Sequence, residues 1–151
     1  MFGEKLSYQI EANKYNIEGE SRGKLIGGNL TLLHSLLGSN SSIDTDGKIL
    51  FIEDVGEYLY HIDRMLQSLK RAGYFDNCNG LIVGDFTDLR KNTTPFGRNL
   101  KELILEIVDE YNFPVSFGFP AGHGINNYPM ILGREIEFNV SKENTKIIFS
   151  D

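Results

Sequence analysis

Two kinds of side chain in this sequence could move protons together: carboxylates that follow an apolar run, and a histidine flanked by glycines. The apolar run 49–52 is followed by Glu53, Asp54 and Glu57, and His123 lies in the segment PAGHG. An imidazole can take a proton from a nucleophile and pass it to a leaving group, while a carboxylate orients the ring and stabilises its charged form. A buried strand would fix the backbone of these carboxylates and leave their side chains at the mouth of a cleft. The pattern therefore indicates acid–base chemistry at the end of a strand.

Each of these residues also has a purely structural explanation. A carboxylate just after a strand often caps the next helix, because it favours the positive N-terminal end, and this applies equally to Glu53. Glu57 can simply face solvent, and a loop histidine such as His123 is often structural or exposed. His34 and His61 fall inside segments with helical spacing, where we expect ordinary, partly buried side chains. From the residue types alone, both alternatives stay open.

The sequence carries no side chain with the surroundings of an activated nucleophile. The G-x-S-x-G motif is missing, and Cys78 lies between two asparagines with no helix opening behind it. Ser116 falls within a predicted strand, and the serines of 39–42 belong to a polar loop. A metal-dependent alternative that used His123 and the nearby carboxylates is weak, because no HExxH-like pairing of ligands accompanies them. A base and a candidate partner are present without a group for them to activate.

Hydrophobic periodicity places these candidates on a framework of short strands and helices. Asn29 has the type and position of a helix N-cap, and the preceding Gly27-Gly28 lacks the pattern of a phosphate-binding loop. Apolar spacing predicts three helices, at 30–37, 59–69 and 100–111. Apolar runs predict strands at 6–10, 24–26, 49–52, 81–83, 115–119, 130–132, 136–140 and 147–149, with a weaker signal at 15–17. Helices early and strands late predict one layered α/β domain with a mixed sheet.

The composition is that of one ordinary globular domain. The 151 residues are 40% hydrophobic and 24% charged, with a net charge of -6, so we expect no nucleic-acid partner, which would require clustered Lys and Arg. No apolar run approaches the ~20 residues of a membrane span, so no membrane partner is expected either. Residues 1–13 lack the basic and then apolar pattern of a secretory signal. Together with the single cysteine, Cys78, this predicts a cytoplasmic setting, and no cofactor motif is found.

Four short segments carry a resemblance to a known family. They are GKLIGGNL (23–30), LFIEDVGE (50–57), YHIDRML (60–66) and GFPAGH (118–123). In this order they resemble the LD-carboxypeptidase (muramoyltetrapeptide carboxypeptidase) family, over nearly the whole chain. Each segment alone is moderately specific for the family, and the segments together are strong evidence for the resemblance.

The resemblance implies an activity and roles for individual residues. Members of the family are serine peptidases with a Ser-His-Glu triad and no metal. They cleave the bond between a diamino acid (lysine or diaminopimelate) and the terminal D-alanine of murein tetrapeptides during cytoplasmic cell-wall recycling. The resemblance implies that His123 is the general base and that Glu53 orients it, with Glu57 as second choice. It also implies a layered sheet-and-helix fold of the swivelling β/β/α kind and a homodimeric intact enzyme.

The chain departs from the family pattern in one respect. The nucleophilic serine and the oxyanion-hole amides of the family lie on an N-terminal α/β domain, whereas here strand-like alternation begins close to Met1. We therefore expect residues 1–151 to be the C-terminal domain alone, whose partners are the N-terminal nucleophile domain and a murein tetrapeptide. Alone it should be folded but inactive, because loss of a triad nucleophile costs on the order of 10⁶ in turnover. The alternatives are a microcin C-type immunity peptidase domain and a non-catalytic peptide-binding module.

Overall fold

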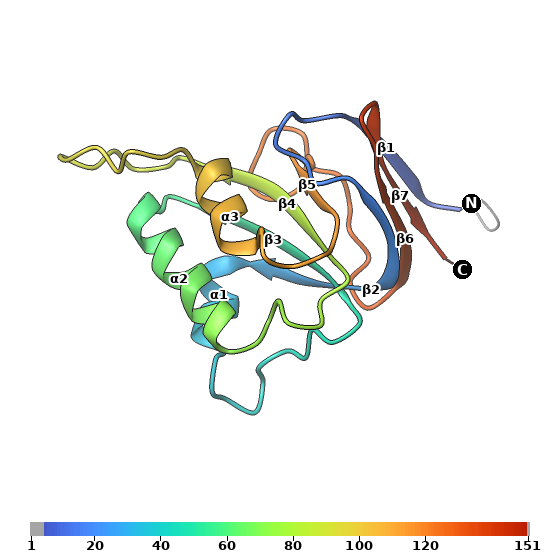
Figure 1. The fold of residues 1–151 in the computed structure, drawn as a ribbon, viewed down its shortest axis with the longest axis horizontal. Helices are drawn as coiled ribbons and strands as arrows, with labels where there is room; N and C mark the ends of the chain where they lie inside the picture. The colour runs from blue at the N-terminus through green and yellow to red at the C-terminus, as the bar shows by residue number, and fades with distance from the viewer. Residues whose placement is uncertain (1–4, 151) are drawn as a thin grey trace.

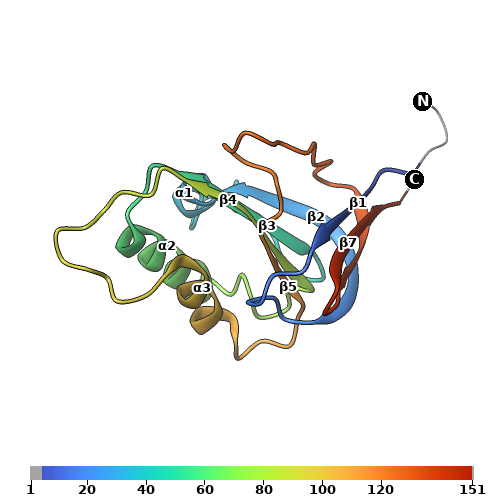
Figure 2. The same ribbon diagram turned by 90° about the horizontal axis from the view of Figure 1, so that it is seen from above.

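Within residues 5–150, which this computed structural model describes, seven strands and three helices form three layers (Figure 1). Along the chain they are β1 (Ser7–Glu11), β2 (Gly19–Asn29), α1 (Leu30–Ser35), β3 (Ile49–Val55), α2 (Leu59–Arg71), β4 (Gly80–Thr87), α3 (Leu100–Val108), β5 (Val115–Phe117), β6 (Glu135–Val140) and β7 (Asn144–Phe149). Parallel strands form the middle layer, with helices on one face and antiparallel strands on the other (Figure 2). The predicted layered α/β fold with a mixed sheet is confirmed.

β2 belongs to both groups of strands because its two halves pair with different neighbours. Gly19–Lys24 runs antiparallel to β6, whereas Leu25–Asn29 runs parallel to β3. The strand order is β1-β7-β6-β2-β3-β4-β5, so β2 lies at the centre of the sheet. The long strand thereby brings the antiparallel group over the face of the parallel strands that the helices leave uncovered (Figure 2).

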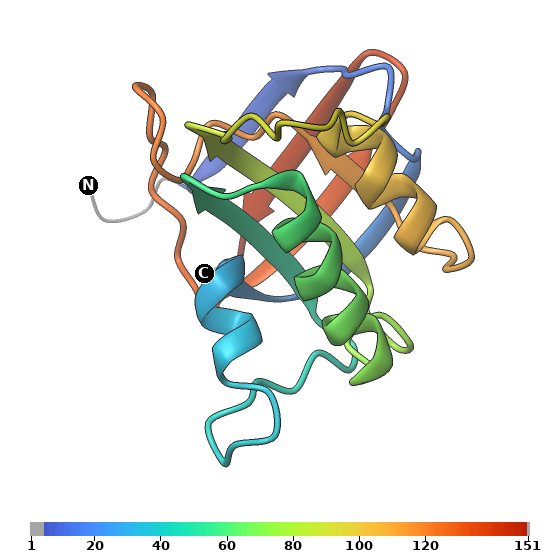
Figure 3. The same cartoon turned by 90° about the vertical axis from the view of Figure 1, so that its left-hand side faces the viewer.

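The apolar run at the start of β3 is explained by cover on both of its faces. Leu50 and Ile52 pack in the core beneath the helices, while Ile49 and Phe51 pack in the core beneath the antiparallel strands. Successive side chains of a strand point to opposite faces, so a strand between two layers must be apolar throughout. Figure 3 shows the three helices in front of the parallel strands. The buried strand expected at 49–52 is thus confirmed.

Helix ends follow local capping chemistry. The Asn29 side chain accepts a hydrogen bond from the Leu32 amide at 3.1 Å, which confirms the predicted N-cap of α1. The helix ends at Ser35, two residues earlier than predicted, and α3 ends at Val108, three residues earlier. α3 begins with a capping box that was not predicted from the sequence, in which Asn99 and Glu102 exchange side-chain to backbone hydrogen bonds.

The predicted strand at 130–132 is wrong. This segment forms no ladder, and Ile131 and Leu132 are exposed, so its apolar character does not reflect burial. The signal at 15–17 corresponds only to an isolated bridge between Ile17 and Val115. The strand predicted at 24–26 is longer in the structure and runs over Gly19–Asn29. Its first half was not predicted because exposed polar side chains there alternate with small residues rather than with large apolar ones.

Candidate active site

The end of β3 sends two adjacent carboxylates to opposite faces of the sheet. Glu53 lies on the same face as Phe51, toward the loop that follows β5, whereas Asp54 points toward the start of α1. Both carboxylates are buried. The pairing of β3 with β4 shifts register here, because Ile52 pairs with Val83 but Asp54 pairs with Phe86. Two residues of β4 therefore lie opposite Glu53 alone, which is the arrangement of a β-bulge.

Glu53 and His123 are in direct contact, although 70 residues separate them. Glu53 Oε2 lies 2.7 Å from His123 Nδ1, within hydrogen-bonding distance. The Glu53 side chain is 8% exposed and that of His123 is 51% exposed. A carboxylate at Nδ1 favours the ring tautomer whose proton is on that nitrogen, so Nε2 is left to accept a proton. The arrangement can therefore serve as a base with its orienting acid.

Glycines on both sides of His123 let its loop pack tightly on these carboxylates. Gly122 has a φ of 133°, and a Cβ atom on it would lie 3.0 Å from Glu53 Oε2. A Cβ atom on Gly124 would lie 2.3 Å from Asp85 Oδ2, far inside contact distance. The sequence pattern PAGHG is therefore explained by close approach as much as by backbone freedom.

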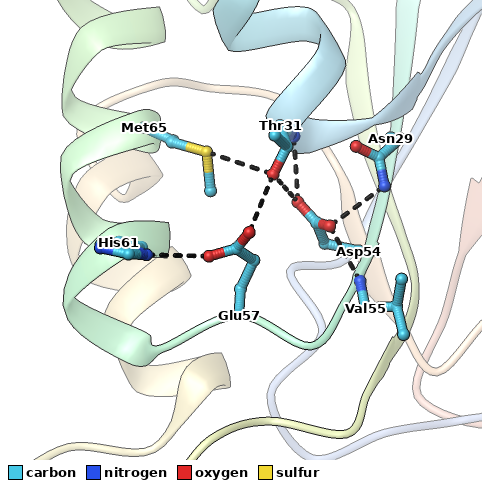
Figure 4. Close-up of polar contacts among 7 residues, drawn as sticks. All are labelled: Asn29, Thr31, Asp54, Val55, Glu57, His61 and Met65. Atoms are coloured by element: carbon cyan, nitrogen blue, oxygen red, sulfur yellow. Dashed lines mark hydrogen bonds and ion pairs between the residues drawn. The ribbon is translucent and has the colours of Figure 1, made fainter.

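Asp54 anchors the first turn of α1, as Figure 4 shows. The amide and hydroxyl of Thr31 donate to Asp54 Oδ2 at 2.9 and 2.8 Å, and Asn29 Nδ2 donates to Oδ1 at 3.0 Å. The Val55 amide also donates to Oδ1, at 2.8 Å. The capping role that the sequence left open for Glu53 is not found, because the N-cap of the next helix, α2, makes no side-chain hydrogen bond. Asp54 instead anchors the helix that precedes β3.

Glu57, the second choice for the orienting acid, contacts a different histidine. Its Oε2 lies 2.9 Å from His61 Nδ1, and the Thr31 hydroxyl lies 3.4 Å from its Oε1 (Figure 4). This pair lies on the helical side of the sheet, together with Met65 of α2. The structure therefore brings Glu53, and not Glu57, to His123.

The candidate nucleophiles weighed in the sequence are engaged elsewhere. Ser116 is fully buried in β5, where its hydroxyl lies 2.9 Å from that of Thr145. Cys78 is buried, and its Sγ lies near the carbonyl oxygens of Lys48 and Gly80, at 3.3 and 3.2 Å. Burial raises the pKa of the Cys78 thiol, which disfavours the reactive thiolate. Neither residue contacts His123.

Residues 5–150 contain neither a cluster of metal-ligating side chains nor a helix that could span a membrane. Across residues 5–150, no three His, Cys, Asp or Glu side chains gather closely enough to hold a metal ion together. None of the helices in that range has the length and apolar character to cross a bilayer.

Comparison with known proteins places the chain in a family. The sequence model of the LD-carboxypeptidase C-terminal domain matches residues 22–138. The chain belongs to this family. The matched region runs from β2 into β6, and it contains both Glu53 and His123.

Relatives of this LD-carboxypeptidase domain include proteins with two kinds of name. It is 37% identical over 136 residues to a probable murein peptide carboxypeptidase of Bacillus subtilis, covering 87% of this chain and 41% of that protein. It is 30% identical over 136 residues to the microcin C7 self-immunity protein of Escherichia coli, covering 85% and 37%. The crystal structure of a muramoyltetrapeptide carboxypeptidase from Oxalobacter formigenes matches with a TM-score of 0.89 and 26% identity, covering 100% and 52%. The domain thus spans about two fifths of the length of these curated relatives.

One carboxylate beside this site was not predicted from the sequence. Asp85 lies near the end of β4, just after the predicted strand 81–83, and its side chain packs against the loop that carries His123. The available signal was the one used for Glu53, a carboxylate directly after a buried apolar run of a parallel strand. What the sequence could not indicate is the bulge, which depends on the pairing of β3 with β4.

Proposed function

We propose that this LD-carboxypeptidase domain supplies the general base and its orienting acid to a serine peptidase that removes the terminal D-alanine from murein tetrapeptides. The contact of Glu53 Oε2 with His123 Nδ1 carries the proposal, because it joins a buried carboxylate to a half-exposed imidazole at a strand end. Relatives named for murein peptides and for the murein tetrapeptide support the substrate class. The nucleophilic serine would come from polypeptide outside these 151 residues.

In the proposed reaction, His123 acts through Nε2. This nitrogen accepts the proton of the serine hydroxyl while the serine oxygen attacks the carbonyl carbon of the diamino acid residue, and it then protonates the departing D-alanine nitrogen. Water next attacks the acyl-enzyme and gives one proton to His123, which passes it to the departing serine oxygen. The tripeptide is released as a carboxylic acid, which loses its remaining proton to solvent. Glu53 stabilises the imidazolium that forms in both steps.

The test is the release of D-alanine by an enzyme in which this domain is joined to the nucleophile domain of the family. His123→Ala should lower kcat by about 10⁶ and Glu53→Ala by about 10⁴, as loss of the base and of the orienting acid does in a serine protease. Glu57→Ala is the matched control, because Glu57 bonds to His61 on the helical side of the sheet. Full activity of Glu53→Ala, together with loss of activity in Glu57→Ala, would transfer the orienting role to Glu57.

The isolated domain should release no D-alanine above the uncatalysed rate. It should still be folded, because two cores are complete within the described residues. Turnover of a murein tetrapeptide by the isolated domain at a normal enzymatic rate would refute the assignment of the serine to another segment. Tight binding of the tetrapeptide without turnover would instead support a peptide-binding module.

One observation favours the immunity-type peptidase as a second candidate. The rings of Tyr58 and Tyr60 stack 5.2 Å apart and line a pocket of about 500 Å³ together with Pro95 and Phe96. Such a surface can stack on a nucleobase. In the completed enzyme, a higher kcat/KM for a peptide–nucleotide than for a murein tetrapeptide, lowered selectively by Tyr60→Ala, would establish this alternative.

A further inference from the structure

The bulge in β4 turns an acidic side chain toward the site. In a regular strand, the successive residues Gly84 and Asp85 would point to opposite faces of the sheet. In the structure both face the loop after β5. A Cβ atom added to Gly84 would lie 2.4 Å from the Ala121 carbonyl oxygen, and a Cβ atom added to Gly122 would lie 3.3 Å from Asp85 Cβ. Bulges commonly re-aim a side chain next to a functional site. Asp85 is therefore held on the His123 side of the sheet rather than in the helical core.

Two polar atoms at this strand end lack hydrogen-bond partners. Among residues 5–150 only three buried side-chain oxygen or nitrogen atoms are unpaired, and two of them are Asp85 Oδ2 and Thr87 Oγ1. Buried polar atoms in folded proteins are nearly always satisfied, so an unpaired carboxylate oxygen requires an explanation. Asp85 and Thr87 are themselves only partly buried, so a small rotation of either side chain would turn its unpaired oxygen toward a ligand that donates hydrogen bonds.

Both residues line the pocket that His123 also lines. Its volume is about 480 Å³, and Asp88, Gly124 and Ile125 complete much of its wall. Of the described residues that line it, none is lysine or arginine, whereas two are aspartates. The buried Glu53 adds a further carboxylate behind the imidazole. The charges of this pocket thus favour a cation.

We propose that this pocket binds a primary ammonium group, with Asp85 as its main acceptor. The inference rests on the proposed function, in which the residue before the terminal D-alanine is a diamino acid with a side-chain ammonium. An ammonium offers three donors on a flexible stem, which matches one carboxylate and one hydroxyl with free lone pairs. The pocket adjoins the imidazole, so a side chain bound there belongs to the residue whose carbonyl is attacked.

The experiment compares two peptides that differ only in the ammonium. N-acetyl-L-lysyl-D-alanine and N-acetyl-L-norleucyl-D-alanine are titrated into the ¹⁵N-labelled 151-residue chain, and amide shifts are followed by NMR. The lysyl peptide should shift amides of 84–88 and 122–125 and bind about tenfold more tightly than the norleucyl peptide, the difference one charge-assisted hydrogen bond supplies. Asp85→Asn should abolish this preference. The charge-matched control Asp109→Asn, at an exposed position at the end of α3, should retain it.

Several results would overturn the ammonium pocket. They are equal affinity for the two peptides, no shifts at these amides, an unchanged preference in Asp85→Asn, or the same shifts produced by MgCl₂ alone, which would indicate a metal site. The titration needs no serine, so its outcome is separate from that of the proposed function. D-alanine release with a failed titration would refute only the ammonium pocket, and binding without release in the completed enzyme would refute only the catalytic role.

Discussion

His123 can approach Glu53 because its two neighbours in the chain, Gly122 and Gly124, have no side chains. The loop lies so close to β3 and β4 that the positions of Cβ atoms on Gly122 and Gly124 fall against Glu53 and Asp85. The short contact between the imidazole and the acid therefore depends on the absence of two methyl groups. The loop position is set by packing rather than by the hydrogen bond alone.

Gly124→Ala tests this dependence. The new methyl group would overlap Asp85 Oδ2, so we expect a loss of about 1–3 kcal/mol in the free energy of unfolding, as for other overpacked sites. Urea denaturation of both chains gives the difference. Asp85→Ala should restore part of the lost stability when combined with Gly124→Ala, because it removes the atoms that clash. A Gly124→Ala chain as stable as the original would contradict the packing argument.

Among the elements, β3 and α1 are joined through Asp54. The carboxylate is 2% exposed and accepts four hydrogen bonds, two of them from Thr31 in the first turn of the helix. Ionised acceptors at a helix start also interact favourably with the helix dipole. α1 has only six residues, so its position depends on this anchor more than on its own hydrogen bonds.

Asp54→Asn should therefore destabilise the chain although it preserves the side-chain shape. One oxygen becomes a donor that faces other donors, and we expect a loss of about 2–4 kcal/mol in urea denaturation. Asp63→Asn on α2 is the control, with an expected change within about 0.5 kcal/mol. A double-mutant cycle with Thr31→Val should give a coupling free energy of about 0.5–3 kcal/mol. Additive effects would show that Thr31 is not the partner that matters.

The sequence predicted elements whose cause is local or periodic. The apolar run of β3 and the N-cap Asn29 have signals within a few residues, and both were identified. The strand prediction at 130–132 failed because this segment is apolar without being buried. The residues that follow it bond to Leu25, which accepts a hydrogen bond from the Gly133 amide and donates one to the Arg134 carbonyl. The bulge beside Glu53 is a property of two strands together, so nothing within either strand could predict it.

The candidate site was predictable in part for the same reason. The types and flanking residues of Glu53 and His123 indicated acid–base chemistry, and the family resemblance selected Glu53 over Glu57. Spacing alone could not separate these two acids, because the choice depends on which face of β3 each side chain meets. The roles of both residues stay predictions until activity is measured.

At the scale of the whole molecule, Cys78 reports on the integrity of the fold. Its thiol is buried where β4 begins, and burial raises its pKa, so the thiolate form favours the unfolded chain. Stability from this group is complete below the unfolded pKa of about 8.5 and is lost as the pH rises toward the higher folded value. The free energy of unfolding should therefore fall between pH 7 and about pH 9.5.

Urea denaturation at the two pH values measures this change, and Cys78→Ala should show a smaller fall than the original chain. Alkylation by iodoacetamide offers an independent readout: in native buffer it should be about a thousandfold slower than in concentrated urea, since so small a fraction of a stable domain is open. Rapid alkylation of the native chain would show that the region around β4 opens without global unfolding.

The double pairing of β2 has a consequence for cooperativity. One uninterrupted strand contributes Gly19–Lys24 to the antiparallel layer and Leu25–Asn29 to the parallel one, so neither layer can detach without breaking the ladder of the other. Amide protons of β3 and β6 should then exchange with solvent through the same opening event and with similar protection. The acid on β3 and the histidine that follows β5 would become ordered together, in one step, as the chain folds.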